Sequence, residues 1–199
     1  MEYIRGKTSA GIDAAGLAAG YDDVLIDVGT GDGRYVMHVA RTRPSWFAVG
    51  VDACRENLRK ASRTAPANAL HVIANALALP KELDGMASKV TINFPWGSLL
   101  AGLLDGEPGL LKGLLAIARP GAALEVRLNA GALAGAGYTL ESGGARVRRA
   151  LREGGFDAGD LLRLDARDLR RCHTTWAKRL AYGRDPRAVC LRGRSSPPP

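Results

Sequence analysis

The chain is 199 residues long, is 46% hydrophobic and carries a formal net charge of +8. This length suits one domain with a substantial buried core. No apolar run reaches the roughly 18 residues of a membrane-spanning helix, and the first residues lack the apolar core of a signal peptide. The three cysteines lie far apart and fit no metal-ligand spacing. We therefore expect a cytoplasmic protein with reduced thiols and no metal site.

In chain order, the hydrophobic pattern predicts a small N-terminal hairpin extension within residues 1–20, followed by seven strands that alternate with helices. The strands are expected at Val24–Val28, Trp46–Val51, Leu70–Ala74, Lys89–Phe94, Ala122–Leu128, Leu161–Leu164 and Arg187–Leu191. The helices are expected at Arg34–Arg43, Arg55–Thr64, Pro108–Ala118 and Gly144–Glu153. This alternation favours a parallel sheet in a single domain over residues 1–194. The Gly/Ala-rich segment Asn129–Tyr138 is expected to be a mobile linker, and residues 195–199 a disordered tail.

The most informative stretch covers residues 24–34 and reads Val-Leu-Ile-Asp-Val-Gly-Thr-Gly-Asp-Gly-Arg. Residues 24–28 are all apolar except Asp27, and this absence of alternating polar residues is expected of a strand buried on both faces of a parallel sheet. The glycines allow a tight turn and the close approach of a ligand, and the helix that follows would offer free N–H groups to that ligand. Asp52 ends the second strand about 20 residues later, where an acid can accept hydrogen bonds from ribose hydroxyls.

The glycine spacing distinguishes between nucleoside ligands. A pyrophosphate-binding loop usually reads Gly-x-Gly-x-x-Gly, whereas here glycines 29, 31 and 33 alternate and the charge of Asp27 would repel a pyrophosphate. The pattern Asp-x-Gly-x-Gly-x-Gly resembles the first motif of class I S-adenosylmethionine (SAM)-dependent methyltransferases. This resemblance implies an α/β fold with a Rossmann-like seven-stranded sheet whose last strand is antiparallel. It also implies that Asp27 faces the cationic methionine end of SAM and that Asp52 binds its ribose.

Two further segments carry tryptophans suited to holding a nucleobase. The fourth strand ends in Asn-Phe-Pro-Trp-Gly-Ser over residues 93–98, which resembles the base-binding motif of nucleobase methyltransferases. An extruded base offers a flat face to an aromatic ring and an edge to amide or carbonyl groups. Residues 174–184 place Trp176 among several cations, the interleaving expected where a base and its phosphates are bound together. We expect Trp96 and Trp176 to face each other across the cofactor site.

Positive charge gathers in two places. Residues 163–194 carry ten cations against three acids. The second cluster comprises Arg55, Arg59, Lys60 and Arg63, whose arginines are four residues apart and therefore share one helix face. Clustered cations with few compensating acids point to a phosphate backbone as the partner.

Together these segments closely resemble the aminoglycoside-resistance methyltransferases of the kanamycin–apramycin type, which act on N1 of a decoding-site adenine in 16S ribosomal RNA. The resemblance extends from Arg5 to Arg192, and its distinctive parts are residues 94–100 and 176–184. It implies methyl transfer from SAM to that adenine in the assembled 30S subunit, with S-adenosylhomocysteine as the product. It also implies resistance to aminoglycosides and a monomeric enzyme.

The resemblance assigns the site residue by residue. Trp96 and Trp176 are expected to sandwich the target base. The residues expected to bind the cofactor are Asp27, Gly29, Thr30, Gly31, Tyr35, Asp52, Ala76, Leu77, Asn93, Phe94, Pro95, Trp96, Gly97, Ser98, Thr174, Thr175 and Trp176. The residues expected to bind RNA are Arg55, Arg59, Lys60, Arg63, Lys178, Arg179, Arg184 and Arg187.

One residue departs from the family pattern. The family usually has an acid at the position of Leu77, where it would accept a hydrogen bond from the amino group of the cofactor. Its loss is expected to weaken cofactor binding by about 0.5–1.5 kcal/mol. Asn75 is the nearby residue that could compensate.

The expected chemistry needs no general base, because adenine N1 has a free lone pair and carries no proton. Catalysis would depend on in-line positioning and on the exclusion of water, and the tryptophan faces would favour the cationic product. Two alternatives stay open. Another RNA nucleobase methyltransferase could act on guanine N7 of transfer RNA or on an exocyclic amine, because Asn93 could accept a hydrogen bond from an amine. A non-catalytic RNA-binding protein could also use the same scaffold.

Overall fold

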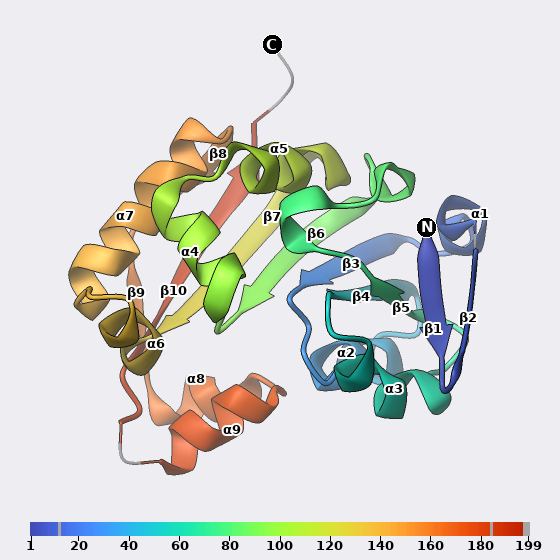
Figure 1. Cartoon of the computed structure of the whole chain (residues 1–199), viewed down its shortest axis with the longest axis horizontal. Helices are drawn as coiled ribbons and strands as arrows, with labels where there is room; N and C mark the ends of the chain where they lie inside the picture. Colours follow the sequence, from blue (N-terminus) through green and yellow to red (C-terminus); the bar gives the residue numbers. More distant parts are fainter. Residues whose placement is uncertain (12, 184, 197–199) are drawn as a thin grey trace.

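The strands pair into one mixed sheet with helices on both faces (Figure 1). The computed structural model describes residues 1–11, 13–183 and 185–196. The strands are β1 (Glu2–Arg5), β2 (Thr8–Gly11), β3 (Asp23–Val28), β4 (Trp46–Asp52), β5 (Ala69–Ile73), β6 (Ala87–Asn93), β7 (Ala118–Asn129), β8 (Phe156–Ala158), β9 (Leu162–Leu164) and β10 (Ala188–Ser195). The helices are α1 (Ala14–Ala18), α2 (Arg34–Thr42), α3 (Arg55–Arg63), α4 (Gly97–Asp105), α5 (Pro108–Ile117), α6 (Ala130–Gly135), α7 (Leu140–Glu153), α8 (Ala166–Arg171) and α9 (Thr175–Tyr182), with 3₁₀ turns η1 (Ala76–Ala78) and η2 (Lys81–Leu83).

The sheet has the predicted Rossmann-like topology. Its five central strands run parallel in the order β5-β4-β3-β6-β7. Strand β10 lies antiparallel between β7 and β8, with Leu191 opposite Val126. All seven predicted strands occur with shifted ends. The N-terminal hairpin β1–β2 lies in the segment expected to hold one and extends the edge beside β5, and β8 is a strand that was not predicted.

Strand β3 explains why the first apolar run shows no alternation. Val24, Ile26 and Val28 pack into the main core, which α1, α4, α5 and α7 share. Leu25 points to the opposite face and packs into a smaller core beneath α2. Because both faces are covered, consecutive residues of the strand are all buried. Asp27 is the polar exception and lies on the α2 side of the strand.

Two expectations about irregular segments are wrong. The predicted linker Asn129–Tyr138 contains helix α6, because Ala130, Ala132 and Leu133 pack into the main core. The predicted tail begins too early, since β10 runs to Ser195, whose hydroxyl accepts from Ala122 N–H at 2.9 Å and donates to the Arg119 carbonyl at 2.6 Å. Residues 197–199 of that tail lie outside the described residues.

The connection between β9 and β10 folds into two short helices, α8 and α9, that the sequence pattern did not predict. They lie beyond the carboxyl ends of the central strands, at the lower edge of Figure 1. Leu169, Ala177 and Leu180 of these helices bury Phe94, which follows β6. A small separate core therefore attaches this helical pair to the carboxyl edge of the sheet. None of the helices in the described part of the chain is both long and apolar enough to cross a membrane.

His71 gives the fold an expected dependence on pH. It is buried on β5, and neither ring nitrogen has a hydrogen-bond partner among the described residues. Burial lowers its pKa to about 4. The unfolded chain binds a proton near pH 6.5, so the contribution of neutral His71 is complete above that pH. This contribution to the free energy of unfolding is lost as the pH falls towards 4. The loss amounts to on the order of 3 kcal/mol.

Thermal denaturation between these pH values measures this effect. Replacement of His71 by phenylalanine should flatten the dependence. Parallel pH profiles for the parent chain and His71→Phe would contradict the prediction.

Candidate active site

Most of the residues expected to bind the cofactor line one cavity of about 390 Å³. It lies at the carboxyl ends of β3 and β6, where the connections leave the sheet in opposite directions and where α/β folds bind ligands. The predicted residues that line it are Asp27, Gly29, Thr30, Gly31, Asp52, Ala76, Asn93, Phe94, Pro95, Trp96, Ser98, Thr174, Thr175 and Trp176. Asn75, expected to compensate for Leu77, also lines it, and residues that were not predicted complete the lining: Asp32, Val51, Ala53, Asn57, Ala74 and Leu99.

The glycine loop is shaped by packing at one position and by the cavity at another. Gly29 has a φ of 72°, which L side chains rarely adopt, and a Cβ there would lie 2.5 Å from Leu99 Cδ2, so that side chain would also have to move. Gly31 has a φ of 58° with open space where a Cβ would project, so a ligand can approach its backbone closely. The Gly31 N–H donates to Asp52 Oδ2 at 2.8 Å, and the Cys54 N–H donates to Asp52 Oδ1 at 2.9 Å. Asp52 thus joins the loop to β4, with lone pairs left to accept from hydroxyl groups.

Asp27 is a buried carboxyl group beside the cavity. Its Oδ1 accepts from Thr91 Oγ1 at 2.7 Å and from Asn93 Nδ2 at 2.8 Å. Burial raises the pKa of Asp27 above its usual range, although these hydrogen bonds and the charge of Arg127 act in the opposite direction. A cation bound in the cavity would stabilise the ionised form. The site is therefore suited to a positively charged ligand group.

Arg127, which was not predicted from the sequence, holds Asn93 in place from the side away from the cavity. Its Nη1 donates to Asn93 Oδ1 at 2.6 Å, and its Nη2 pairs with Glu125 Oε1 at 2.9 Å. Glu125 also pairs with Lys89 at 2.8 Å and with Arg192 at 3.3 Å. Burial alone would raise the pKa of Glu125, but the three surrounding cations lower it to about 2. The alternation of polar residues along β6 and β7 could have predicted this network from the sequence, because these side chains share the sheet face that carries Asp27.

The two tryptophans come together as predicted. The rings of Trp96 and Trp176 stack with centroids 5.1 Å apart and planes inclined by 28°. Trp96 is 44% exposed, whereas Trp176 packs partly against the core of α8 and α9 and lies beneath the Arg179 guanidinium. Phe94 has a φ of 54°, a conformation that costs energy in a non-glycine residue and often marks functional sites. This backbone turn buries Phe94 and sends Trp96 to the cavity mouth.

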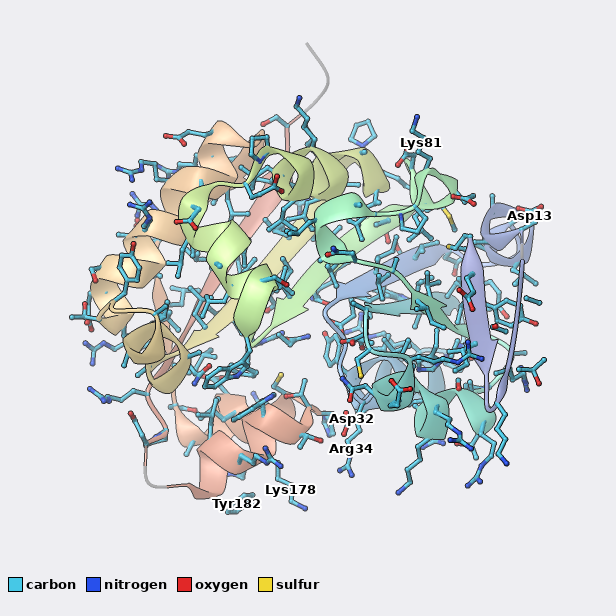
Figure 2. The ribbon with its side chains drawn as sticks, viewed as in Figure 1. Asp13, Asp32, Arg34, Lys81, Lys178 and Tyr182 are labelled. Atoms are coloured by element: carbon cyan, nitrogen blue, oxygen red, sulfur yellow. The ribbon has the colours of Figure 1, made fainter. Side chains whose placement is uncertain are left out.

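A hydrogen bond connects α9 to the glycine loop across the cavity. Thr175 Oγ1 donates to Asp32 Oδ2 at 2.6 Å, and the same carboxylate pairs with Arg34 at 3.0 Å. In Figure 2, Asp32, Arg34, Lys178 and Tyr182 follow the lower edge of the molecule, from the start of α2 to α9. The α8–α9 segment therefore forms one wall of the cavity.

Three of the residues expected to bind the cofactor lie elsewhere. Tyr35 points to a separate polar pocket beside Glu125 and Arg127, and burial raises its pKa to about 12. Leu77 packs its side chain into the main core near Gly102, while its N–H donates to Asn75 Oδ1 at 3.0 Å. Gly97 lies behind the cavity at the start of α4. These three residues therefore do not line this cavity, because neighbours along a loop point to different sides of it.

The residues expected to bind RNA are mostly exposed near the cavity. Arg59, Lys60, Arg63, Lys178 and Arg179 are exposed on α3 and α9. Two predicted residues already have partners: Arg55 pairs with Glu2 and donates to the Lys7 carbonyl, and Arg187 forms a bidentate pair with Asp185. Arg184 lies outside the described residues. Arg34 and Arg170, which were not predicted, line a second pocket with Lys178 and Tyr182.

The fold and the cavity define a class I SAM-dependent methyltransferase. A Rossmann-like sheet with an antiparallel last strand carries the glycine loop, the acid that ends the second strand and a tryptophan pair at one edge. Within the described residues, no group of three or more histidine, cysteine, aspartate or glutamate side chains is placed to hold a metal ion.

Comparison with known proteins identifies the particular family. The family described as NpmA, 16S rRNA (adenine(1408)-N(1))-methyltransferase, matches residues 2–195. The chain is 35% identical over 185 residues to the enzyme of this name from Streptoalloteichus tenebrarius, covering 85% of each chain. It is 31% identical to the enzyme of this name from Escherichia coli, covering 82% of this chain and 83% of the relative. The chain therefore belongs to the 16S rRNA (adenine(1408)-N(1))-methyltransferases.

Solved structures agree with this assignment. The crystal structure of the 16S rRNA methyltransferase KamB matches with a TM-score of 0.88 and 33% identity over 99% of this chain and 100% of that one. A substituted form of the Catenulisporales acidiphilia 16S rRNA (adenine(1408)-N(1))-methyltransferase, solved with its cosubstrate SAM, matches with a TM-score of 0.86 and 28% identity. That match covers 100% of this chain and 98% of the other.

Proposed function

We propose that this chain transfers a methyl group from SAM to N1 of the decoding-site adenine of 16S ribosomal RNA in the 30S subunit. The observation that carries the proposal is the stacked pair of Trp96 and Trp176 at the mouth of a cavity that begins at the glycine loop. Methylation at this position would prevent aminoglycosides from binding the decoding site. We further propose that the enzyme acts as a cytoplasmic monomer.

The cavity residues fit SAM by their chemistry. Asp27 offers a buried carboxylate to the cationic methionine end, and the glycine loop offers close backbone approach. Asp52 offers acceptors to the ribose hydroxyls, and Ala76 flanks the adenine. When bound, SAM supplies an electrophilic methyl group on a sulfonium. Trp96 and Trp176 would then hold the target base in line with that group.

The target nitrogen explains why the site can work without an acid–base pair. Adenine N1 attacks with its own lone pair, so no proton has to be removed. The new N–C bond forms as the S–C bond breaks, and the positive charge moves from the sulfonium to the base. The tryptophan faces favour that cation by about 0.5–2 kcal/mol each. Positioning and the exclusion of water would supply most of the rate enhancement.

The exposed cations around the cavity form the proposed RNA surface. One part lies on α3 and the other on α8, α9 and the start of α2. We assign to this surface Arg34, Arg59, Lys60, Arg63, Arg170, Lys178 and Arg179. Phosphate contacts fix the position of a protein on RNA, and base contacts supply specificity. This surface would hold the subunit while the tryptophans select the adenine.

Charge reversal on this surface is expected to weaken 30S binding without changing the affinity for SAM. Lys60→Glu and Lys178→Glu each remove one phosphate contact. Each variant should lower the slope of log K against log salt by about one. Filter binding at several salt concentrations measures the slope. Arg149→Glu on α7, on the other face of the sheet and 66% exposed, serves as the control. Unchanged salt slopes for both variants would contradict the RNA surface.

A comparison of substrates tests the proposed function itself. The cations come from separate elements, which suits several folded RNA segments better than one hairpin. We therefore expect methylation of 30S particles to be much faster than methylation of protein-free 16S RNA. Primer extension detects the product, because a methyl group at N1 blocks base pairing. Equal rates on the two substrates would refute the requirement for the subunit, and the absence of a stop at the decoding-site adenine would refute the function.

A further inference from the structure

Asn93 at the end of β6 is positioned by donors on one side and an acceptor on the other. Its Oδ1 accepts from Arg127 Nη1 at 2.6 Å, and its Nδ2 donates to Asp27 Oδ1 at 2.8 Å. A guanidinium carries only donors, so the amide oxygen of Asn93 must face Arg127. The amide therefore has one orientation, with its oxygen towards Arg127 and its nitrogen towards Asp27.

The second lone pair of the Asn93 oxygen also has a donor close by. Cys172 Sγ lies 3.8 Å from Oδ1 and is placed to donate to it. Cys172 is buried, and burial raises the pKa of its thiol, so the S–H is retained. A carbonyl oxygen has two lone pairs, and here a guanidinium N–H and a thiol S–H face them.

Arg127 cannot easily turn away from this contact. Glu125 holds its other terminal nitrogen at 2.9 Å, and Lys89 and Arg192 fix Glu125 in turn. The side chain of Arg127 is only 13% exposed. Its guanidinium lines the pocket behind the sheet edge rather than the cavity that would hold the cofactor. Arg127 is thus a positioning residue that acts on the site through Asn93.

The occupied carbonyl affects which nitrogen of a base can react. The lone pair of an exocyclic amine is delocalised into the ring, and an acceptor that binds the amine protons helps to localise it on nitrogen. A ring nitrogen has an in-plane lone pair and needs no such acceptor. With its oxygen occupied, Asn93 can offer only N–H towards the cavity.

We propose that Arg127, assisted by Cys172, determines the choice of nucleophile by occupying the Asn93 carbonyl, so that the site methylates a ring nitrogen and rejects the neighbouring exocyclic amine. This inference rests on the proposed function, because it concerns the selection of N1 over N6 on the same adenine. It also accounts for the presence of an asparagine at a strand end that could otherwise bind an amine.

Replacement of Arg127 by methionine tests the inference, because it removes the donors while keeping a long apolar stem. Purified 30S subunits are methylated with SAM, the RNA is digested to nucleosides, and N1-methyladenosine and N6-methyladenosine are quantified by mass spectrometry. We expect the N1 product to fall roughly tenfold and the N6 product to become measurable. Thr91 still donates to Asp27, but loss of the Arg127 charge raises the pKa of that carboxyl further and should weaken SAM binding, so the two products are compared at saturating SAM. Arg127→Lys, which keeps a donor, should restore the N1 product.

Two controls keep the outcome unambiguous. Arg119→Met removes an exposed arginine from the same strand and should behave like the parent chain. If Arg127→Met fails to fold, Cys172→Ala frees one lone pair without disturbing the ion pairs and should give a smaller N6 fraction. Variants that fold and form only the N1 product would overturn the inference. If the parent chain forms no N1 product, the proposed function fails instead.

Discussion

Replacement of Trp96 by alanine is expected to lower methylation of the 30S subunit strongly while leaving the fold intact. Trp96 is 44% exposed, so its removal deprives the core of little contact. Stacking of a base on one aromatic ring is worth about 1–3 kcal/mol, which corresponds to a loss of roughly 5- to 150-fold. Turnover on 30S subunits, measured together with thermal melting, tests this expectation. Trp96→Phe should keep part of the activity because a stacking face remains.

Trp176→Ala should lose activity to a similar degree but also lose some stability, because this ring packs partly against the core of α8 and α9. The stacked rings must also separate before a base can enter. Their centroids are 5.1 Å apart, whereas a base between two rings needs about 7 Å, or two layers of about 3.5 Å each. A fall in melting temperature for Trp96→Ala that accounts for its lost activity would show that this ring is structural instead.

Replacement of Asp27 by asparagine is expected to weaken SAM binding by roughly 10- to 150-fold, the loss of one charged hydrogen bond of about 1.5–3 kcal/mol. The substitution keeps the shape and can still accept from Thr91, so it removes mainly the charge. The free protein should not be destabilised, because burial already disfavours the carboxylate. Isothermal titration with SAM and a thermal melt measure both effects.

The raised pKa of Asp27 gives this prediction a dependence on pH. The folded chain favours the neutral acid, so the stability from this group is present at low pH and is lost as the pH rises through the raised pKa. A cationic ligand needs the ionised form, so the affinity for SAM should weaken as the pH falls below that pKa. Asp27→Asn should lose this dependence, whereas Asp32→Asn at the cavity mouth should retain it. Identical pH profiles for the parent chain and Asp27→Asn would place the cationic end of SAM elsewhere.

Two residues expected to bind the cofactor show the limit of prediction from sequence. Tyr35 and Leu77 follow correctly placed elements, yet their side chains turn away from the cavity. A loop or helix start sends successive residues in different directions, and the backbone angles that decide this depend on packing. The Gly/Ala-rich segment after β7 was misjudged for a related reason. Small residues such as Ala130 and Ala132 suit a linker and a tightly packed helix equally well.

The sequence by itself determined the elements whose cause is local. The apolar run of β3, the alternating glycines and the acid that ends β4 depend on near neighbours, and so do the segments that contain Trp96 and Trp176. Only the tertiary structure decided what these elements do together. The tryptophan stack, the Thr175–Asp32 hydrogen bond and the contact between Arg127 and Asn93 join residues far apart in the chain. Their partners are chosen by the order of strands in the sheet and by the docking of α8 and α9, which no local pattern encodes.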